Sequence, residues 1–192
     1  MEKKLLIFKL SSYLYMNSPV VLTGGIKTQR PNRPHKRTIN TEALLKCPTN
    51  IDGVKILDTD VFTDHRGDLW TTWKKDEFPY DINFNHDKVS SSRKRVLRGI
   101  HGDYKSTKLV TCLYGELYFV YIDNREESET YLEWNSIILN DRSRKLVLLP
   151  PGVGNGFLVL SDFSIFSYKW SYEGNYPDVD EQFTLKWNDP LL

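Results

Sequence analysis

From residue 52 onward, short apolar runs alternate with turn-forming residues along the chain. Each run is rich in Val, Ile, Leu and aromatic side chains, and Gly, Asp, Asn or Pro separates it from the next. Such runs predict β-strands, because branched and aromatic side chains pack well on a pleated surface. The expected strands cover 54–57, 69–73, 108–113, 117–122, 136–139, 146–149, 156–160 and 165–170.

The order of these runs favours an all-β fold. Only residues 74–80 have a composition that allows a helical turn, and the segment 114–116 is typical of a tight hairpin turn. The strand at 117–122 is apolar on both faces, as in the interior of a double-sheet jelly roll or at a dimer contact. We therefore expect one antiparallel double-sheet jelly roll.

The first 50 residues differ from the rest. The segment 27–37 (KTQRPNRPHKR) has hardly any apolar residue, so it cannot bury enough surface to offset the entropy of ordering. Lys9 interrupts the apolar run near the start, which argues against a signal peptide. The sequence predicts a flexible basic arm over 1–50 and a single domain over 51–192.

The composition limits the kinds of binding partner that we expect for this chain. The chain has 192 residues, 40% of them apolar, and a net charge of +1. This balance gives no reason to expect a nucleic-acid or membrane surface. Cys47 and Cys112 form no CxxC pair, so neither a disulfide framework nor a zinc site is indicated, and a reducing, cytoplasmic location is expected.

The segment from Arg98 to Lys108 contains the most distinctive chemistry. An imidazole at His101 can remove a proton beside a carbonyl, an ammonium at Lys108 can stabilise the enolate oxygen, and a guanidinium at Arg98 can hold an anionic group. Taken alone, the same residues also fit the solvated edge of a strand.

Other segments turn this set into a family resemblance. The matching pieces, in chain order, are FTDHRG (62–67), SSS (90–92), VLRGIH (96–101), KLV (108–110), GE (115–116), DNR (123–125) with Ser128, PPG (150–152), GF (156–157), YK (168–169), Tyr176 and WND (187–189). The region from Phe62 to Pro190 resembles the dTDP-4-dehydrorhamnose 3,5-epimerase family. In detail, 84–88, 101–103 and 172–176 are similar to epimerases of GDP-4-keto-6-deoxy-heptoses.

The resemblance implies a cupin-like jelly roll, a homodimer and a nucleotide-diphosphate 4-keto-6-deoxy sugar as substrate, in surface polysaccharide or deoxysugar biosynthesis. The C4 ketone acidifies the hydrogens at C3 and C5, and reprotonation of the enolate on the other face inverts the centre. Because the ketone is the electron sink, no redox cofactor or metal is needed.

The resemblance also implies roles for individual residues. His101 is the base, Lys108 holds the developing oxyanion, and Tyr168 returns the proton from the opposite face. The expected substrate-binding residues are Arg66, His86, Lys88, Arg98, Asn155 and Tyr176. Each of these residues also has a purely structural interpretation on a strand, and Asp103 fits either orienting a histidine or ending a strand.

Two departures from the family pattern stand out. Asn155 occupies the place of a loop histidine, and the sequence ends at Leu192, before the segment in which relatives have an aspartate that pairs with the catalytic histidine. We expect Asp64, Asp87 or Asp103 to substitute for it if the histidine is oriented at all. The alternatives are an inactive sugar-nucleotide-binding relative and, less favoured because His101 has no histidine partner nearby, a 3,4-ketoisomerase.

Overall fold

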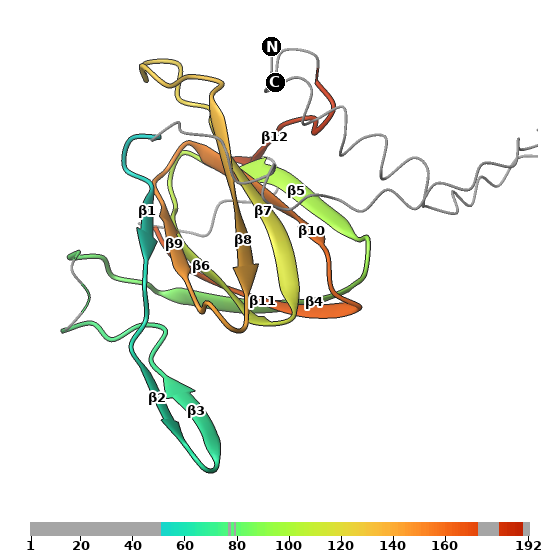
Figure 1. The fold of residues 1–192 in the computed structure, drawn as a ribbon. Coiled ribbons are helices and arrows are strands. Elements are labelled where there is room, and N and C mark those ends of the chain that lie inside the picture. Colours follow the sequence, from blue (N-terminus) through green and yellow to red (C-terminus); the bar gives the residue numbers. More distant parts are fainter. Residues whose placement is uncertain (1–50, 77, 79, 173–180, 190–192) are drawn as a thin grey trace, which may run out of the picture.

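Two five-stranded antiparallel sheets packed face to face make up most of the described chain (Figure 1). In the computed structural model, residues 51–76, 78, 80–172 and 181–189 are described. The first sheet has the order β1-β9-β6-β11-β4 and the second sheet has the order β12-β5-β10-β7-β8, while β2 and β3 form a separate hairpin. The strands are β1 (Lys55–Leu57), β2 (Val61–Asp64), β3 (Gly67–Trp70), β4 (His86–Arg93), β5 (Leu97–Gly102), β6 (Thr107–Tyr114), β7 (Glu116–Asp123), β8 (Trp134–Asn140), β9 (Leu146–Leu149), β10 (Val153–Val159), β11 (Phe163–Ser171) and β12 (Phe183–Thr184).

This architecture confirms the expected all-β antiparallel double-sheet fold. Every apolar run expected to be a strand overlaps one in the structure. At 74–80 the described residues contain no helix, and one hydrogen bond, from the N–H of Phe78 to the carbonyl of Lys74 (2.9 Å), closes a single turn. Across the described part of the chain there is no helix with the length and apolar character needed to cross a membrane. The arm at 1–50 lies outside the described residues.

The expected hairpin at 114–116 is wrong in one respect. A sharp turn is present, but it joins β6 of the first sheet to β7 of the second sheet, and these strands do not pair. Gly115 has a φ of 81°, and a Cβ there would lie 2.2 Å from the carbonyl oxygen of Phe163. Glycine is therefore required for a corner that carries the chain between layers.

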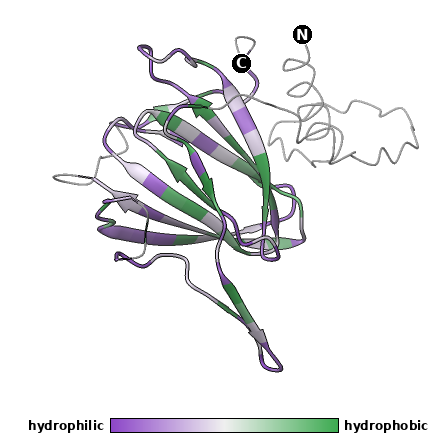
Figure 2. Cartoon of the chain, turned by 60° about the vertical axis from the view of Figure 1, so that its left-hand side comes forward, coloured by the Kyte–Doolittle hydropathy of each residue, from purple (hydrophilic) through white to green (hydrophobic). Residues whose placement is uncertain are grey.

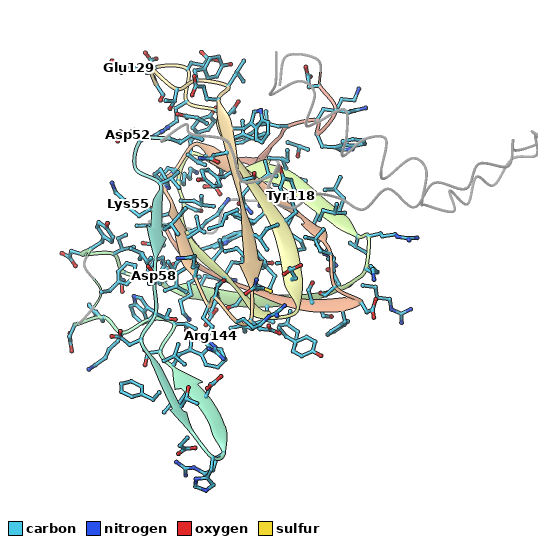
Figure 3. All side chains as sticks on the ribbon, viewed as in Figure 1. Asp52, Lys55, Asp58, Tyr118, Glu129 and Arg144 are labelled. Carbon is cyan, nitrogen blue, oxygen red and sulfur yellow. The ribbon has the colours of Figure 1, made fainter. Side chains whose placement is uncertain are left out.

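The main core lies between the two sheets, where side chains from both layers interdigitate (Figure 3). From β7, Leu117, Phe119 and Tyr121 enter this core. The other face of β7 is also covered, since Tyr118 packs with Leu158 and Ile122 packs in a separate cluster. The expectation of two apolar faces on this strand is confirmed.

A buried ion pair stabilises the loop after β7. Asp123 has no exposed surface and accepts hydrogen bonds from Arg125 Nε (2.8 Å) and from the hydroxyls of Ser128 and Thr130 (2.6 Å each). Burial alone would raise the pKa of Asp123, but these donors more than offset it and hold the pKa well below its usual value. The pair is structural, as its position beside a turn suggests.

The β2–β3 hairpin projects from the sandwich (Figure 1). Arg144, labelled in Figure 3, stacks on Trp70 (4.7 Å to the ring centroid) and pairs with Asp68, which fixes the hairpin on that side. Phe62 and Leu69 are directly opposite each other, so they share a face, and each is 71% exposed. Hydrophobic segments of this hairpin are visible in Figure 2.

Candidate active site

One wall of the site is a row of side chains across the second sheet. Thr184, His101, Asn155 and Tyr121 lie directly opposite one another on β12, β5, β10 and β7. Directly opposed residues of antiparallel strands share a face. Because Tyr121 belongs to the core between the sheets, the whole row faces the first sheet. Arg98 is opposite the core residue Phe157, so it faces the same way; a bulge separates the two register segments.

The facing wall comes from the first sheet. His86, Trp170 and Lys108 form one row on β4, β11 and β6. Lys88, Tyr168 and Val110 form the next row. Tyr168 and Val110 pack in the core between the sheets, and residues two apart on a strand share a face, so both rows face the second sheet.

The sequence-predicted site residues thus gather on two facing walls. Arg98 connects the walls directly, because its Nε donates to Ser92 Oγ on β4 (2.8 Å). The first sheet supplies His86, Lys88, Lys108 and Tyr168, and the second sheet supplies Arg98, His101 and Asn155.

Lys108 is the most buried cation of the site. Its side chain is 8% exposed, its Nζ lies 3.2 Å from Asp103 Oδ2, and it lies 5.2 Å from the centroid of the Trp170 ring. Burial lowers the pKa of Lys108, and the Asp103 carboxylate opposes that effect without cancelling it. Burial also disfavours the Asp103 anion, but Lys108 and the backbone N–H groups of Lys105 and Ser106 keep the pKa of Asp103 below its usual value.

His101 is exposed, and its Nδ1 lies 2.9 Å from the hydroxyl of Thr184. The carboxylates considered from the sequence pair with cations instead. Those pairs are Asp64 with Arg66, Asp87 with Lys169 and Asp103 with Lys108. In this structure a hydroxyl, rather than one of those carboxylates, contacts the imidazole.

The short strand β12 brings that hydroxyl into place. Phe183 packs over Gly102 and Gly154, where an added Cβ would lie 2.2 Å and 2.9 Å from its ring. Tyr104 contacts the same ring (centroids 5.2 Å apart). The two glycines therefore form a notch for Phe183, and the next residue, Thr184, faces His101 as a result.

Two predicted residues do not join these walls. Arg66 lies at the tip of the β2–β3 hairpin, with a side chain that is 79% exposed and paired with Asp64. Tyr176 lies outside the described residues. Sequence reasoning missed Thr184 and Ser92 as contacts of the site: Thr184 has no local sequence signal, and Ser92 lies in the SSS motif of the resemblance but was given no role.

The arrangement suits proton transfer on both faces of a flat intermediate. An imidazole projects from one sheet, and a phenol and an ammonium project from the other. Such groups can take a proton from one side, stabilise an oxyanion and return a proton from the other side. Among the described residues, no group of three or more His, Cys, Asp or Glu side chains is placed to hold a metal ion.

Comparisons with known proteins agree with this chemistry. The family model described as dTDP-4-dehydrorhamnose 3,5-epimerase matches residues 48–192. The dTDP-4-dehydrorhamnose 3,5-epimerase of Escherichia coli K12 is 35% identical over 151 residues, which cover 75% of this chain and 80% of the relative.

Solved structures show the same similarity. The Legionella pneumophila dTDP-6-deoxy-D-glucose-3,5-epimerase, in complex with dTDP-4-keto-L-rhamnose, has 31% identity and a TM-score of 0.68, and the match covers 74% of this chain and 78% of that one. NovW of Streptomyces spheroides, a 4-keto-6-deoxy sugar epimerase, has 32% identity and a TM-score of 0.69, with 76% and 75% covered. The predicted cupin-like jelly roll and sugar-nucleotide epimerase are confirmed, and the chain belongs to the dTDP-4-dehydrorhamnose 3,5-epimerase family.

Proposed function

We propose that His101 and Tyr168 act as base and acid in the epimerisation of a nucleotide-linked 4-keto-6-deoxy sugar at C3, C5 or both, with Lys108 at the C4 oxygen. One observation supports this above all others. The imidazole and the phenol project from opposite sheets into the same space, as inversion of a carbon centre requires.

The proton balance follows from this placement. His101 takes the proton from carbon, and the electron pair of the broken C–H bond moves into the ketone, which becomes an enolate. The Lys108 ammonium stabilises the enolate oxygen. Tyr168 then donates its phenolic proton to the opposite face of the carbon, and exchange with solvent restores both side chains to their starting states.

The remaining wall residues suit the binding of an anionic substrate. A guanidinium can fork onto phosphate oxygens, and Arg98 is already oriented by its hydrogen bond to Ser92. Lys88 and His86 add positive or polar character to the same wall, and Asn155 lies directly opposite His101. We favour dTDP as the nucleotide, because it appears in the names of the Escherichia coli and Legionella pneumophila relatives.

The exposed hairpin supports a homodimer. Phe62 and Leu69 share one face of the hairpin, and each is 71% exposed in the described chain. This apolar face is therefore available to a second copy. Arg66 lies at the tip of the same hairpin, apart from the two walls of its own chain, so in this proposal it contacts the substrate of the second copy. Sedimentation velocity tests whether the chain is a dimer, and replacing both apolar residues by Ser should yield a monomer.

We retain the single domain over 51–192 and a cytoplasmic location as parts of the proposal.

The catalytic roles are tested by incubation with dTDP- and GDP-4-keto-6-deoxy sugars in deuterium oxide, followed by mass spectrometry. The wild type should gain one deuterium at each inverted centre, and His101→Asn should abolish the gain. Tyr168→Phe should allow deuterium exchange but block inversion, because the base can return deuterium only to the face from which it took the proton. Tyr131→Phe, in the loop before β8, is the matched control and should behave as the wild type. Binding without exchange at any centre would instead support an inactive relative.

A further inference from the structure

We infer that Asp103 is a positioning residue for the reaction: it places the Lys108 side chain at the substrate oxygen and keeps it in the ammonium form. This rests on the proposed role of Lys108 as the oxyanion-stabilising group.

Asp103 has two oxygens with separate tasks. Its residue is only 2% exposed, in the loop between β5 and β6. Oδ1 accepts hydrogen bonds from the backbone N–H groups of Lys105 (2.9 Å) and Ser106 (2.6 Å), which fixes the carboxylate to its own loop. Oδ2 lies 3.2 Å from Lys108 Nζ. The carboxylate is thus anchored independently of the cation that it holds.

Lys108 needs such a counter-charge. Its ammonium is removed from water on the inner wall, and burial favours the neutral amine. A second cation, Lys88, lies 4.7 Å from the ring of Trp170, the ring that Lys108 also contacts, and like charges disfavour each other. Among the described residues, the other ionisable groups on the two walls are His86, Arg98, His101, Tyr121 and Tyr168. None of these supplies a negative charge while the two phenols keep their protons.

A purely structural role for Asp103, as the cap of the loop, makes a different prediction. Asp103→Asn keeps an amide oxygen that can accept the bonds from Lys105 and Ser106 but removes the charge beside Lys108. A structural role predicts an unchanged pH profile in this variant. A positioning role predicts that the amine loses its proton more readily.

The experiment is the pH dependence of kcat for deuterium incorporation in the full-length chain. We expect the basic limb of Asp103→Asn to move to lower pH by about one pH unit, with about tenfold lower activity above the wild-type limb, at little change in KM. Asp103→Glu keeps the charge and should leave the limb in place. A superimposable profile for wild type and Asp103→Asn would overturn the inference.

Loss of the phenolic proton of Tyr168 would also produce a basic limb in the pH profile. Lys108→Arg therefore separates the limb due to the lysine from the limb due to the phenol. Arginine stays protonated, so the limb that remains in this variant belongs to the phenol. Adding Asp103→Asn to Lys108→Arg should then shift nothing, and an equal shift in that background would also overturn the inference. Lys108→Arg alone should lose the limb due to lysine, which identifies that limb in the wild-type profile before the Asp103 variants are compared with it. An inactive wild type would contradict the proposed function instead, which keeps the two failures apart.

Discussion

Substituting Gly102 by Ala tests how the site holds its base. A Cβ at this position would lie 2.2 Å from Phe183 Cζ, whereas carbon atoms in contact lie about 3.5 Å apart or more. The ring must therefore retreat by about 1.3 Å, the difference between those distances. Because Phe183 precedes Thr184 on the two-residue strand β12, the displacement is passed to the hydroxyl that contacts His101.

The expected size of the effect follows from these distances. A shift of about 1 Å would stretch the 2.9 Å contact between Thr184 and His101 to about 3.9 Å, beyond hydrogen-bond range. Misplacement of a catalytic group by about 1 Å commonly costs about a hundredfold in rate. Overpacking of a fitted site costs about 1–3 kcal/mol of folding free energy. We therefore expect Gly102→Ala to incorporate deuterium about a hundredfold more slowly and to lose about 1–3 kcal/mol of folding free energy in urea denaturation.

Relief of the clash supplies the control. Phe183→Leu removes the ring atoms that lie closest to the new methyl group and leaves only its 2.9 Å approach to the Gly154 Cα, so Gly102→Ala combined with Phe183→Leu should recover about tenfold of the lost rate. Gly154→Ala, with its closest approach to the same ring at 2.9 Å, should be milder than Gly102→Ala. If Gly102→Ala turned over at the wild-type rate, the idea that β12 positions the base would be refuted.

Three further predictions concern single groups. Thr184→Val should lower the exchange rate about a hundredfold, as the displaced hydroxyl does in Gly102→Ala, while Thr184→Ser, which keeps the hydroxyl, should stay near wild type in the same assay. Gly115→Ala should destabilise the fold by more than about 2 kcal/mol in urea denaturation, because its φ is 81° and the methyl group would meet the Phe163 carbonyl. Asp123→Asn should cost about 3 kcal/mol at pH 7, since it leaves Arg125 without its partner. The pKa of Asp123 is lower in the folded chain than in the unfolded chain, so its stabilisation is present above about pH 4 and is lost at lower pH; the difference in melting temperature between wild type and variant should shrink accordingly.

Apolar pattern alone was enough for most of the strands but not for two of the strands that line the site. β4 (His86–Arg93) and β5 (Leu97–Gly102) were not among the apolar runs, because inward positions such as His86, Lys88 and Arg98 are polar. A strand that lines a polar site lacks the apolar alternation by which buried strands are recognised. The family resemblance singled out these residues as site candidates where hydrophobicity did not.

Contacts between distant segments could not be predicted from the sequence, for a different reason. A tight turn at Gly115 has the same local chemistry whether it joins partners in one sheet or strands of two sheets. Thr184 belongs to a strand of only two residues, and its approach to His101 depends on the packing of Phe183 against two glycines. Likewise, the sequence left open whether Asp103 orients a histidine or ends a strand, and its pairing with Lys108 emerged only from the fold.

The loop between β5 and β6 explains why the chemical groups are so close in sequence yet face each other in space. His101 lies near the end of β5 in the second sheet, and Lys108 lies near the start of β6 in the first sheet. The chain therefore crosses from one wall to the other between these two residues. A loop this short leaves little freedom to adjust the separation of the walls, which favours a preorganised site. Asp103 lies inside that crossing, hydrogen-bonded to the loop backbone and ion-paired with Lys108. Any change that loosens this loop should therefore disturb the base and the oxyanion-stabilising group together, whereas changes in β12 should disturb the base alone.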